Sequence, residues 1–110
     1  ETKGIIDGIS STNTYSMKVV DEKGQEAFPG RASAGVSGAA VKKLSQEQAK
    51  NIVEYKKELG LKDFTVIGIG GVIDPEDVDE YLSLGVDAVQ SAVGVWENPY
   101  LGIEYLKEIN

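Results

Sequence analysis

Short apolar runs alternate along the chain with longer stretches in which apolar residues recur at helical spacing. The apolar runs lie at Ile5–Ile9, Phe64–Ile69 and Asp87–Ser91. Runs of this length, bounded by glycine or polar residues, predict short β-strands. The polar stretch 10–14 follows the first run, where a core strand would reach the surface.

A long excursion separates the first predicted strand from the first predicted helix. The segments Met17–Val20 and Gln25–Phe28 resemble the two arms of a small hairpin with its turn at Lys23-Gly24. A loop through residues 29–31 follows. The excursion is too long for a plain connection, and long loops in compact domains often carry function.

Start and stop signals predict three helices. A Ser-x-x-Gln capping-box pattern beginning at Ser45 starts the first, and Gly60 ends it. Asp74-Pro75 starts the second and Gly85 ends it, and a third follows Asn98-Pro99. The residues expected to face inward are Ala49, Ile52, Val53 and Leu59, then Val78, Tyr81 and Leu82, then Leu101, Tyr105, Leu106 and Ile109.

Strands that alternate with helices predict an α/β fold with a parallel sheet, right-handed crossovers and helices covering the sheet. Three parallel strands alone make a narrow sheet with two open edges. The outer strands are apolar and lack the lysine or proline residues that block pairing at an edge. We therefore expect the chain to be part of a larger sheet or to complete one by association.

Composition excludes several classes of function. The 110 residues suffice for one domain, and 11 basic against 18 acidic residues give a net charge of −7, which argues against binding to nucleic acid or an anionic membrane. Without cysteine or histidine the chain has no disulfide, no imidazole catalysis and no usual zinc ligand set, so no metal site is expected. Neither a long apolar segment nor a signal-peptide pattern is present, so the expectation is a soluble cytoplasmic protein.

Glycine-rich junctions mark the candidate ligand site. Gly70-Gly71 closes the second apolar run just before the capped helix at Asp74, an arrangement that leaves backbone N–H groups uncovered and suits a phosphate. Similar junctions lie at Gly35–Gly38 and Ala92–Gly94, so three loops are expected to meet at one end of the sheet. A glycine pair alone is more often an ordinary turn, but the three junctions together predict a nucleotide-type ligand. An acidic protein must bind such an anion through local N–H groups, because its overall field is unfavourable.

Four motifs in the same order resemble the C-terminal part of the dihydroorotate dehydrogenase family. They are Ser11–Thr14, Ala34–Gly38, Ile67–Gly71 and Ala88–Gln90. The flavin domain of dihydropyrimidine dehydrogenase is similar over the same stretch. The resemblance implies that residues 1–110 are the last three strand-helix units of a TIM (β/α)8 barrel that binds FMN, with a small hairpin after the first of these strands.

The resemblance also assigns roles to residues of this chain. In the family, the loops after strands seven and eight hold the FMN phosphate, and an asparagine at the end of strand six contacts the pyrimidine. Asparagine suits a pyrimidine edge because one short side chain offers both a donor and an acceptor, although Asn13 read alone is an ordinary strand-end turn residue. The implied cofactor-binding residues are Gly70, Gly71, Ala92, Val93, Gly35, Val36, Ser37 and Gly38, and the implied substrate-binding residues are Asn13 and Thr14.

Some of these assignments leave alternatives open. Ser37 either caps its own loop or contacts the flavin. The family usually has Gly-Thr or Gly-Ser where this chain has Ala92-Val93, so a hydroxyl contact to the phosphate is lost while amide donation remains. Lys42 matches a lysine common in the family but receives no catalytic role, and Trp96 is expected to be a packing or interface aromatic residue.

The resemblance places the family's catalytic base and flavin-contacting lysine in an earlier barrel half that these residues do not include. No residue here is therefore assigned as catalytic, and the chain alone is expected to be inactive. The intact parent is expected to be an FMN-dependent oxidoreductase acting on dihydroorotate or a dihydropyrimidine, completed by that missing half or by self-association. The alternative is a partial barrel that binds a phosphate ligand or self-associates without catalysis.

Overall fold

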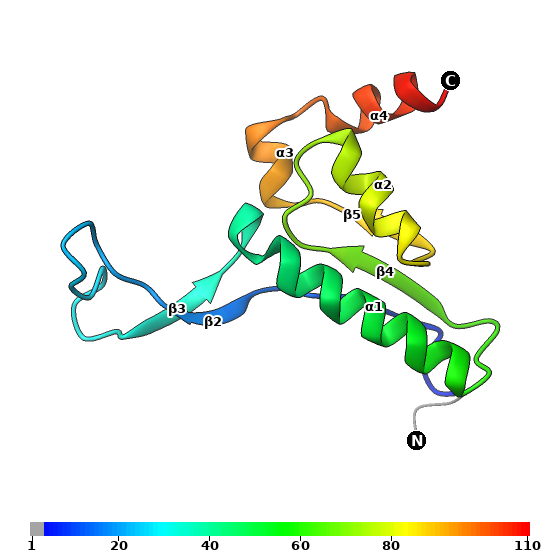
Figure 1. The fold of residues 1–110 in the computed structure, drawn as a ribbon, viewed down its shortest axis with the longest axis horizontal. Helices are drawn as coiled ribbons and strands as arrows, with labels where there is room; N and C mark the ends of the chain where they lie inside the picture. The colour runs from blue at the N-terminus through cyan, green and yellow to red at the C-terminus, as the bar shows by residue number, and fades with distance from the viewer. Residues whose placement is uncertain (1–3) are drawn as a thin grey trace.

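The parallel sheet is confirmed by the computed structural model, which describes residues 4–110 (Figure 1). Strand β4, Thr65–Ile69, lies between β1, Gly8–Ser11, and β5, Ala88–Gln90. Both pairings are parallel, with Ser10 opposite Ile67 and Ile69 opposite Gln90. The carboxyl ends of all three strands therefore lie at the same end of the sheet.

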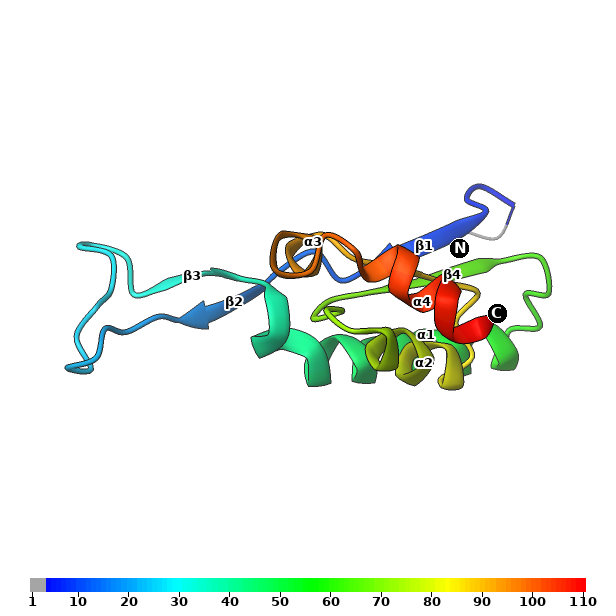
Figure 2. The ribbon, with the colours of Figure 1, turned by 90° about the horizontal axis from the view of Figure 1, so that it is seen from above.

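The helices that connect β1 to β4 and β4 to β5 lie on the same side of this sheet (Figure 2). Helices α1, Lys42–Glu58, and α2, Pro75–Ser83, cover the face that carries Val66 and Gly68. Ile67 and Ile69 alternate with those residues, so they point to the opposite face, where they are only partly buried. The buried core comprises Ala49, Val53, Val66, Val72, Tyr81, Val86 and Leu101.

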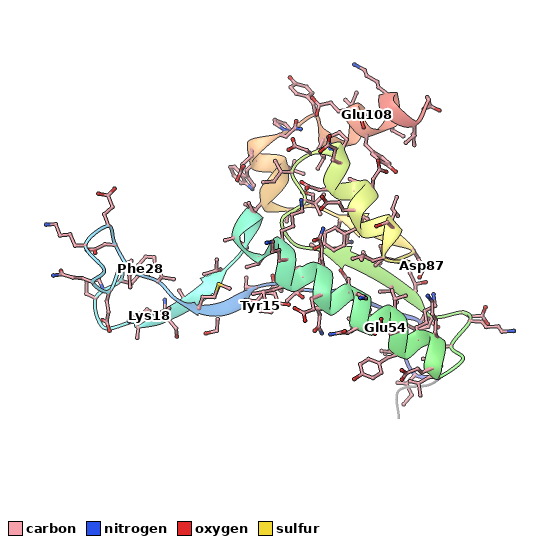
Figure 3. All side chains as sticks on the ribbon, viewed as in Figure 1. Tyr15, Lys18, Phe28, Glu54, Asp87 and Glu108 are labelled. Atoms are coloured by element: carbon pink, nitrogen blue, oxygen red, sulfur yellow. The ribbon has the colours of Figure 1, made fainter. Side chains whose placement is uncertain are left out.

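An antiparallel hairpin projects from this layer as an arm. Strands β2, Tyr15–Lys18, and β3, Ser33–Val36, pair with Met17 opposite Ala34, and Figure 3 labels Lys18 and Phe28 on the arm. The molecule measures 48 × 40 × 19 Å with a radius of gyration of 16.2 Å. A compact domain of this size has a radius of gyration of about 13 Å, so the fold is flat and extended.

The first strand and the hairpin differ from expectation. The strand begins at Gly8 rather than Ile5 and includes polar residues of the stretch expected to follow it. The predicted pairing with Gln25–Phe28 is confirmed only at the tip, where Val20 forms an antiparallel bridge with Glu26 and the Ala27 amide donates to the Val19 carbonyl at 3.2 Å. The rest of the outgoing arm, β2, pairs with β3 instead. The turn itself is confirmed near Lys23-Gly24, where the Asp21 carboxylate accepts the amides of Lys23 at 2.8 Å and Gln25 at 2.9 Å.

The first helix also differs at its start. A 3-10 turn, η1, Gly38–Val41, leads directly into α1, so the helix begins at Lys42 and Ser45 lies inside it. Ser45 is fully buried and is not the cap that its spacing predicted. Leu59, expected to face inward, is 65% exposed because it follows the last turn of α1. The end of the helix at Gly60 is confirmed, with φ +64°.

The remaining helices follow the predicted signals except for one addition. Helix α2 begins after Asp74 with Pro75 in its first turn and ends before Gly85. Helix α4, Leu101–Ile109, follows Asn98-Pro99, although Leu106 and Ile109 on its expected inner face are more than half exposed. Helix α3, Val93–Glu97, is a short helix that the sequence signals did not predict.

Candidate functional site

The loops that follow β1, β4 and β5 meet around a cavity of about 130 Å³. All of the residues predicted to bind cofactor or substrate line it except Gly35 and Val36. Those two residues lie in β3, where Gly35 packs against Thr14 instead of forming part of the loop. The predicted residues that line the cavity are Asn13, Thr14, Ser37, Gly38, Gly70, Gly71, Ala92 and Val93.

The turn at Gly70-Gly71 has a backbone that only glycine adopts without strain. Gly70 has φ +127° and Gly71 has φ +70°. A Cβ atom at Gly71 would lie 2.6 Å from the Cβ of Lys42, and one at Gly70 would overlap Ser45. Helix α1 therefore packs against the turn with no room for a side chain.

Helix α2 contributes the hydrogen bond at the start of this turn. The Tyr81 hydroxyl donates to the Gly70 carbonyl at 2.7 Å, and its ring lies against Gly68. Tyr81 is fully buried, and this burial raises the pKa of Tyr81 to about 12. The hydroxyl is therefore a neutral donor at physiological pH.

Asp77 holds the other end of the same loop. Its Oδ2 accepts the amides of Ile73 at 2.8 Å and Asp74 at 3.0 Å, and its Oδ1 accepts the ammonium of Lys42. Burial by itself raises the pKa of Asp77, but the Asp74, Lys42 and Ile73 hydrogen bonds outweigh it and hold the pKa below its usual value. This carboxylate ties α1 to the start of α2.

Lys42 binds acidic residues of α2 and is not among the residues that line the cavity. Its ammonium also pairs with Glu80 at 2.8 Å. Hydrogen bonds to Asp77 and Glu80 raise the pKa of Lys42 above its ordinary range. Lys42 therefore joins α1 to α2 next to Gly71.

The loops after β4 and β5 are joined directly. The Ser91 hydroxyl donates to the Val72 carbonyl at 2.6 Å, and Gly94 approaches that carbonyl so closely that a Cβ atom would overlap it. The Asn98 side-chain amide donates to the Ile73 carbonyl at 3.3 Å. The role of Ser91 was not predicted from the sequence, because its only local signal is that it ends a predicted strand.

The loop after β1 is fixed to the same end of the sheet. The Thr12 amide donates to the Ile69 carbonyl at 3.2 Å, which places Asn13 and Thr14 beside the Gly70-Gly71 turn. Tyr15 then anchors the following residues, because its hydroxyl donates to the Leu44 carbonyl at 3.0 Å. Thr12 also lines the cavity, and although it lies within the motif Ser11–Thr14, no role was assigned to it from the sequence.

Backbone amides at the cavity have no acceptor within the described part of the chain. This holds for Gly70, Gly71 and Ala92, and Val93 is the first residue of α3, so its amide has no helical acceptor. The nearby carbonyls of Gly70, Val72 and Ile73 all accept side-chain donors. Uncompensated donors beside engaged carbonyls fit an anionic ligand.

The chemistry of the cavity is that of binding and orientation. Among the described residues that line it, none carries an ionisable side chain, and the polar groups are amides and hydroxyls. The same described part of the chain contains no cluster of three or more residues suited to hold a metal ion. Within residues 4–110, no helix is both long and apolar enough to cross a membrane.

Comparison with known proteins extends these observations. The family model for dihydroorotate dehydrogenase matches residues 1–110. A dihydroorotate dehydrogenase from Dictyostelium discoideum is 31% identical over 99 residues, covering 88% of this chain and 26% of that protein. A dihydroorotate dehydrogenase (quinone) from Verminephrobacter eiseniae is 33% identical over 105 residues, covering 94% of this chain and 27% of that protein.

Two further comparisons agree in sequence and in fold. The catalytic subunit of a dihydroorotate dehydrogenase B (NAD(+)) from Oceanobacillus iheyensis is 28% identical over 103 residues, covering 94% of this chain and 32% of that protein. A crystal structure of DHODH from Eimeria tenella in complex with ferulenol matches with a TM-score of 0.70 at 18% identity, covering 97% of this chain and 27% of that one.

The chain thus spans about a quarter to a third of the length of these relatives, which cover it almost completely. The likeness to dihydropyrimidine dehydrogenase stays a prediction. Because the family match extends over residues 1–110, the chain belongs to the dihydroorotate dehydrogenase family.

Proposed function

We propose that this chain forms the phosphate end of the FMN site, and part of the pyrimidine site, of an FMN-dependent dihydroorotate dehydrogenase-like enzyme. One observation carries the proposal. The amides of Gly70, Gly71 and Ala92, which follow two adjacent strands, have no acceptor in the described residues and border one cavity. Phosphate is the anion that such paired loops hold in barrels of this kind.

The arrangement of strands supports a partial barrel. Residues 1–110 would supply its last three strand-helix units, and the rest of the barrel would pair with the edges at β1 and β5. Both edge strands are unpaired on their outer sides among the described residues. The flat shape and the short share of each relative that the chain covers agree with this proposal.

The residues of the cavity fit the phosphate rather than the whole cofactor. Pockets for ligands of drug size occupy about 300–1,000 Å³, whereas this cavity has about 130 Å³. Gly70, Gly71, Ala92 and Val93 would hold the phosphate through their amides. Ser37 makes no side-chain capping hydrogen bond, so its hydroxyl is free to replace the contact that Ala92-Val93 cannot make.

Asn13 would orient the pyrimidine beside the cofactor. Its side chain can pair with both a carbonyl and an N–H group of one edge. Bound FMN supplies the acceptor for a hydride as the substrate's C5–C6 bond becomes double. By the resemblance, the accompanying proton would go to a base in the barrel half that residues 1–110 do not include, and no described residue that lines the cavity carries an ionisable side chain.

The absorbance spectrum of the purified full-length protein tests this function. We expect a flavin spectrum with about one FMN per chain, and bleaching of that spectrum when dihydroorotate is added without oxygen. Bleaching by dihydrouracil instead would move the substrate to the dihydropyrimidine class. A protein that carries no flavin and takes up none from solution would contradict the proposal.

A second candidate function is a phosphate-binding or self-associating module without catalysis. The absence of an ionisable side chain among the described residues that line the cavity favours it. The coding sequence upstream of Glu1 distinguishes the two candidates. An in-frame barrel half supports the enzyme, whereas a start codon close to Glu1 supports the module.

A further inference from the structure

Helix α2 holds the loop Gly70–Asp74 from behind through two side chains spaced one helical turn apart. Tyr81 binds the carbonyl at the start of the loop, and Asp77 binds the amides at its end. Both residues are buried. The loop between them therefore has both ends fixed to one rigid element.

The hydrogen bond from Tyr81 to the Gly70 carbonyl also constrains the amide of Gly71. The carbonyl of Gly70 and the amide of Gly71 belong to one peptide unit, which is planar. The single cis bond among the described residues is elsewhere, so this unit is trans and its N–H points opposite to its C=O. A donor that holds the carbonyl toward α2 consequently turns the Gly71 amide away from α2.

Packing against α1 limits the space around the turn but does not by itself fix the orientation of its peptide units. Gly70 lies against Ser45, and Gly71 lies against Lys42. Both carry positive φ angles, so steric preference alone does not fix this peptide, because glycine accepts many conformations. The buried hydroxyl of Tyr81 supplies the missing constraint, since leaving it unpaired in the core is costly.

We propose that the Tyr81 hydroxyl is a positioning group that aims the Gly71 amide at the phosphate of the cofactor. The inference rests on the proposed FMN site. The proposed role belongs to the hydroxyl and not to the ring. A phenylalanine at this position would keep the packing of the ring against Gly68. Tyr81 acts through Gly70 and touches no ligand itself.

The test is Tyr81→Phe in the full-length protein, titrated with FMN and with riboflavin, which lacks the phosphate. Loss of one neutral hydrogen bond should weaken FMN binding about tenfold, while riboflavin binding stays within about twofold of the wild type. Tyr105→Phe is the matched control. It removes a hydroxyl that bonds Asp79 at 3.2 Å, away from the cavity, and should leave both affinities unchanged.

Replacement of Tyr81 by 4-aminophenylalanine returns a donor to the same place and should restore FMN affinity. Equal weakening of FMN and riboflavin, unchanged FMN binding, or failure of this rescue would overturn the positioning role. A wild-type protein that binds riboflavin as tightly as FMN would instead remove the phosphate site, and the proposed function with it. The two failures are therefore distinguishable.

Discussion

The Ser91 hydroxyl donates a 2.6 Å hydrogen bond to the Val72 carbonyl and so joins the loops that follow β5 and β4. Neither loop is held by regular strand pairing at this point. The relative position of the free amides at Gly70-Gly71 and at Ala92-Val93 therefore depends on this contact, on the close approach of Gly94 to the same carbonyl and on the hydrogen bond from Asn98 to the Ile73 carbonyl.

Ser91→Ala is expected to loosen this junction. Removing the hydroxyl leaves the Val72 carbonyl without its donor and should weaken FMN binding about tenfold, with a loss of about 1 kcal/mol in stability. Ser83→Ala is the control, because the Ser83 hydroxyl makes an equally short bond to the Glu80 carbonyl on the exposed surface of α2. Titration with FMN and urea unfolding measure both effects, and equal behaviour of the two variants would contradict the role of Ser91.

Gly71→Ala is expected to disrupt the turn itself. The new Cβ would lie 2.6 Å from the Lys42 Cβ, at a φ of +70° that disfavours alanine. We expect a loss of about 1–3 kcal/mol in stability together with loss of FMN binding. Gly102→Ala in α4 is the control, since nothing lies within 4 Å of a Cβ there, and it should be neutral or slightly stabilising. Normal FMN content in the Gly71 variant would count against the site.

Asp77→Asn is expected to destabilise the protein in a pH-dependent way. The pKa of Asp77 is lowered in the folded state, so the carboxylate stabilises the fold above its ordinary pKa of 3.8, and this contribution disappears as the pH falls through the lowered folded-state pKa. We expect a loss of about 1–3 kcal/mol at pH 7 that shrinks as the pH falls below 3.8. Urea unfolding across this range measures it, with the exposed Asp63→Asn as control. A loss that is constant with pH would contradict the assignment.

Asn13→Ala tests the pyrimidine contact separately from the phosphate site. The variant should raise KM for dihydroorotate about tenfold or more, because the substrate loses paired hydrogen bonds, while its FMN content stays normal. Asn51→Ala on the exposed side of α1 is the control. An unchanged KM in steady-state kinetics would return Asn13 to the role of a turn residue at the end of a strand.

Chain 1–110 expressed alone is expected to associate through its open sheet edges. Ile9 on β1 is 38% exposed and Ile103 on α4 is 55% exposed. If edge pairing drives association, Ile9→Lys should reduce the sedimentation coefficient and Ile103→Lys should not. A wild-type chain that sediments as a monomer would show that the edges do not pair.

The elements that the sequence predicted well are those with local signals. Asp74, Pro75 and Gly85 set the bounds of α2 through their own backbone preferences, and apolar runs marked β4 and β5. The pairing at the tip of the hairpin was predicted, but β3 was missed because it pairs with β2 across a long intervening segment. Ser45 has the spacing of a capping residue. Because η1 continues directly into α1, however, Ser45 lies inside the helix and is buried in the core, so tertiary packing overrides the local preference.

The candidate site shows the same division. Gly70 and Gly71 were identified because glycine in such a turn is a local requirement. Ser91 and Tyr81 donate to carbonyls of the loop after β4, which are distant from them in sequence. No local sequence pattern around either residue could therefore reveal those contacts. Tyr81 was predicted to face inward, but the partner of its hydroxyl follows only from the fold.

A crystal structure of the full-length protein with FMN tests the central claim most directly. The account predicts a phosphate oxygen within about 3 Å of the amide nitrogens of both Gly71 and Val93. A phosphate bound elsewhere, or amides at these two positions that bond to protein groups instead, would contradict it.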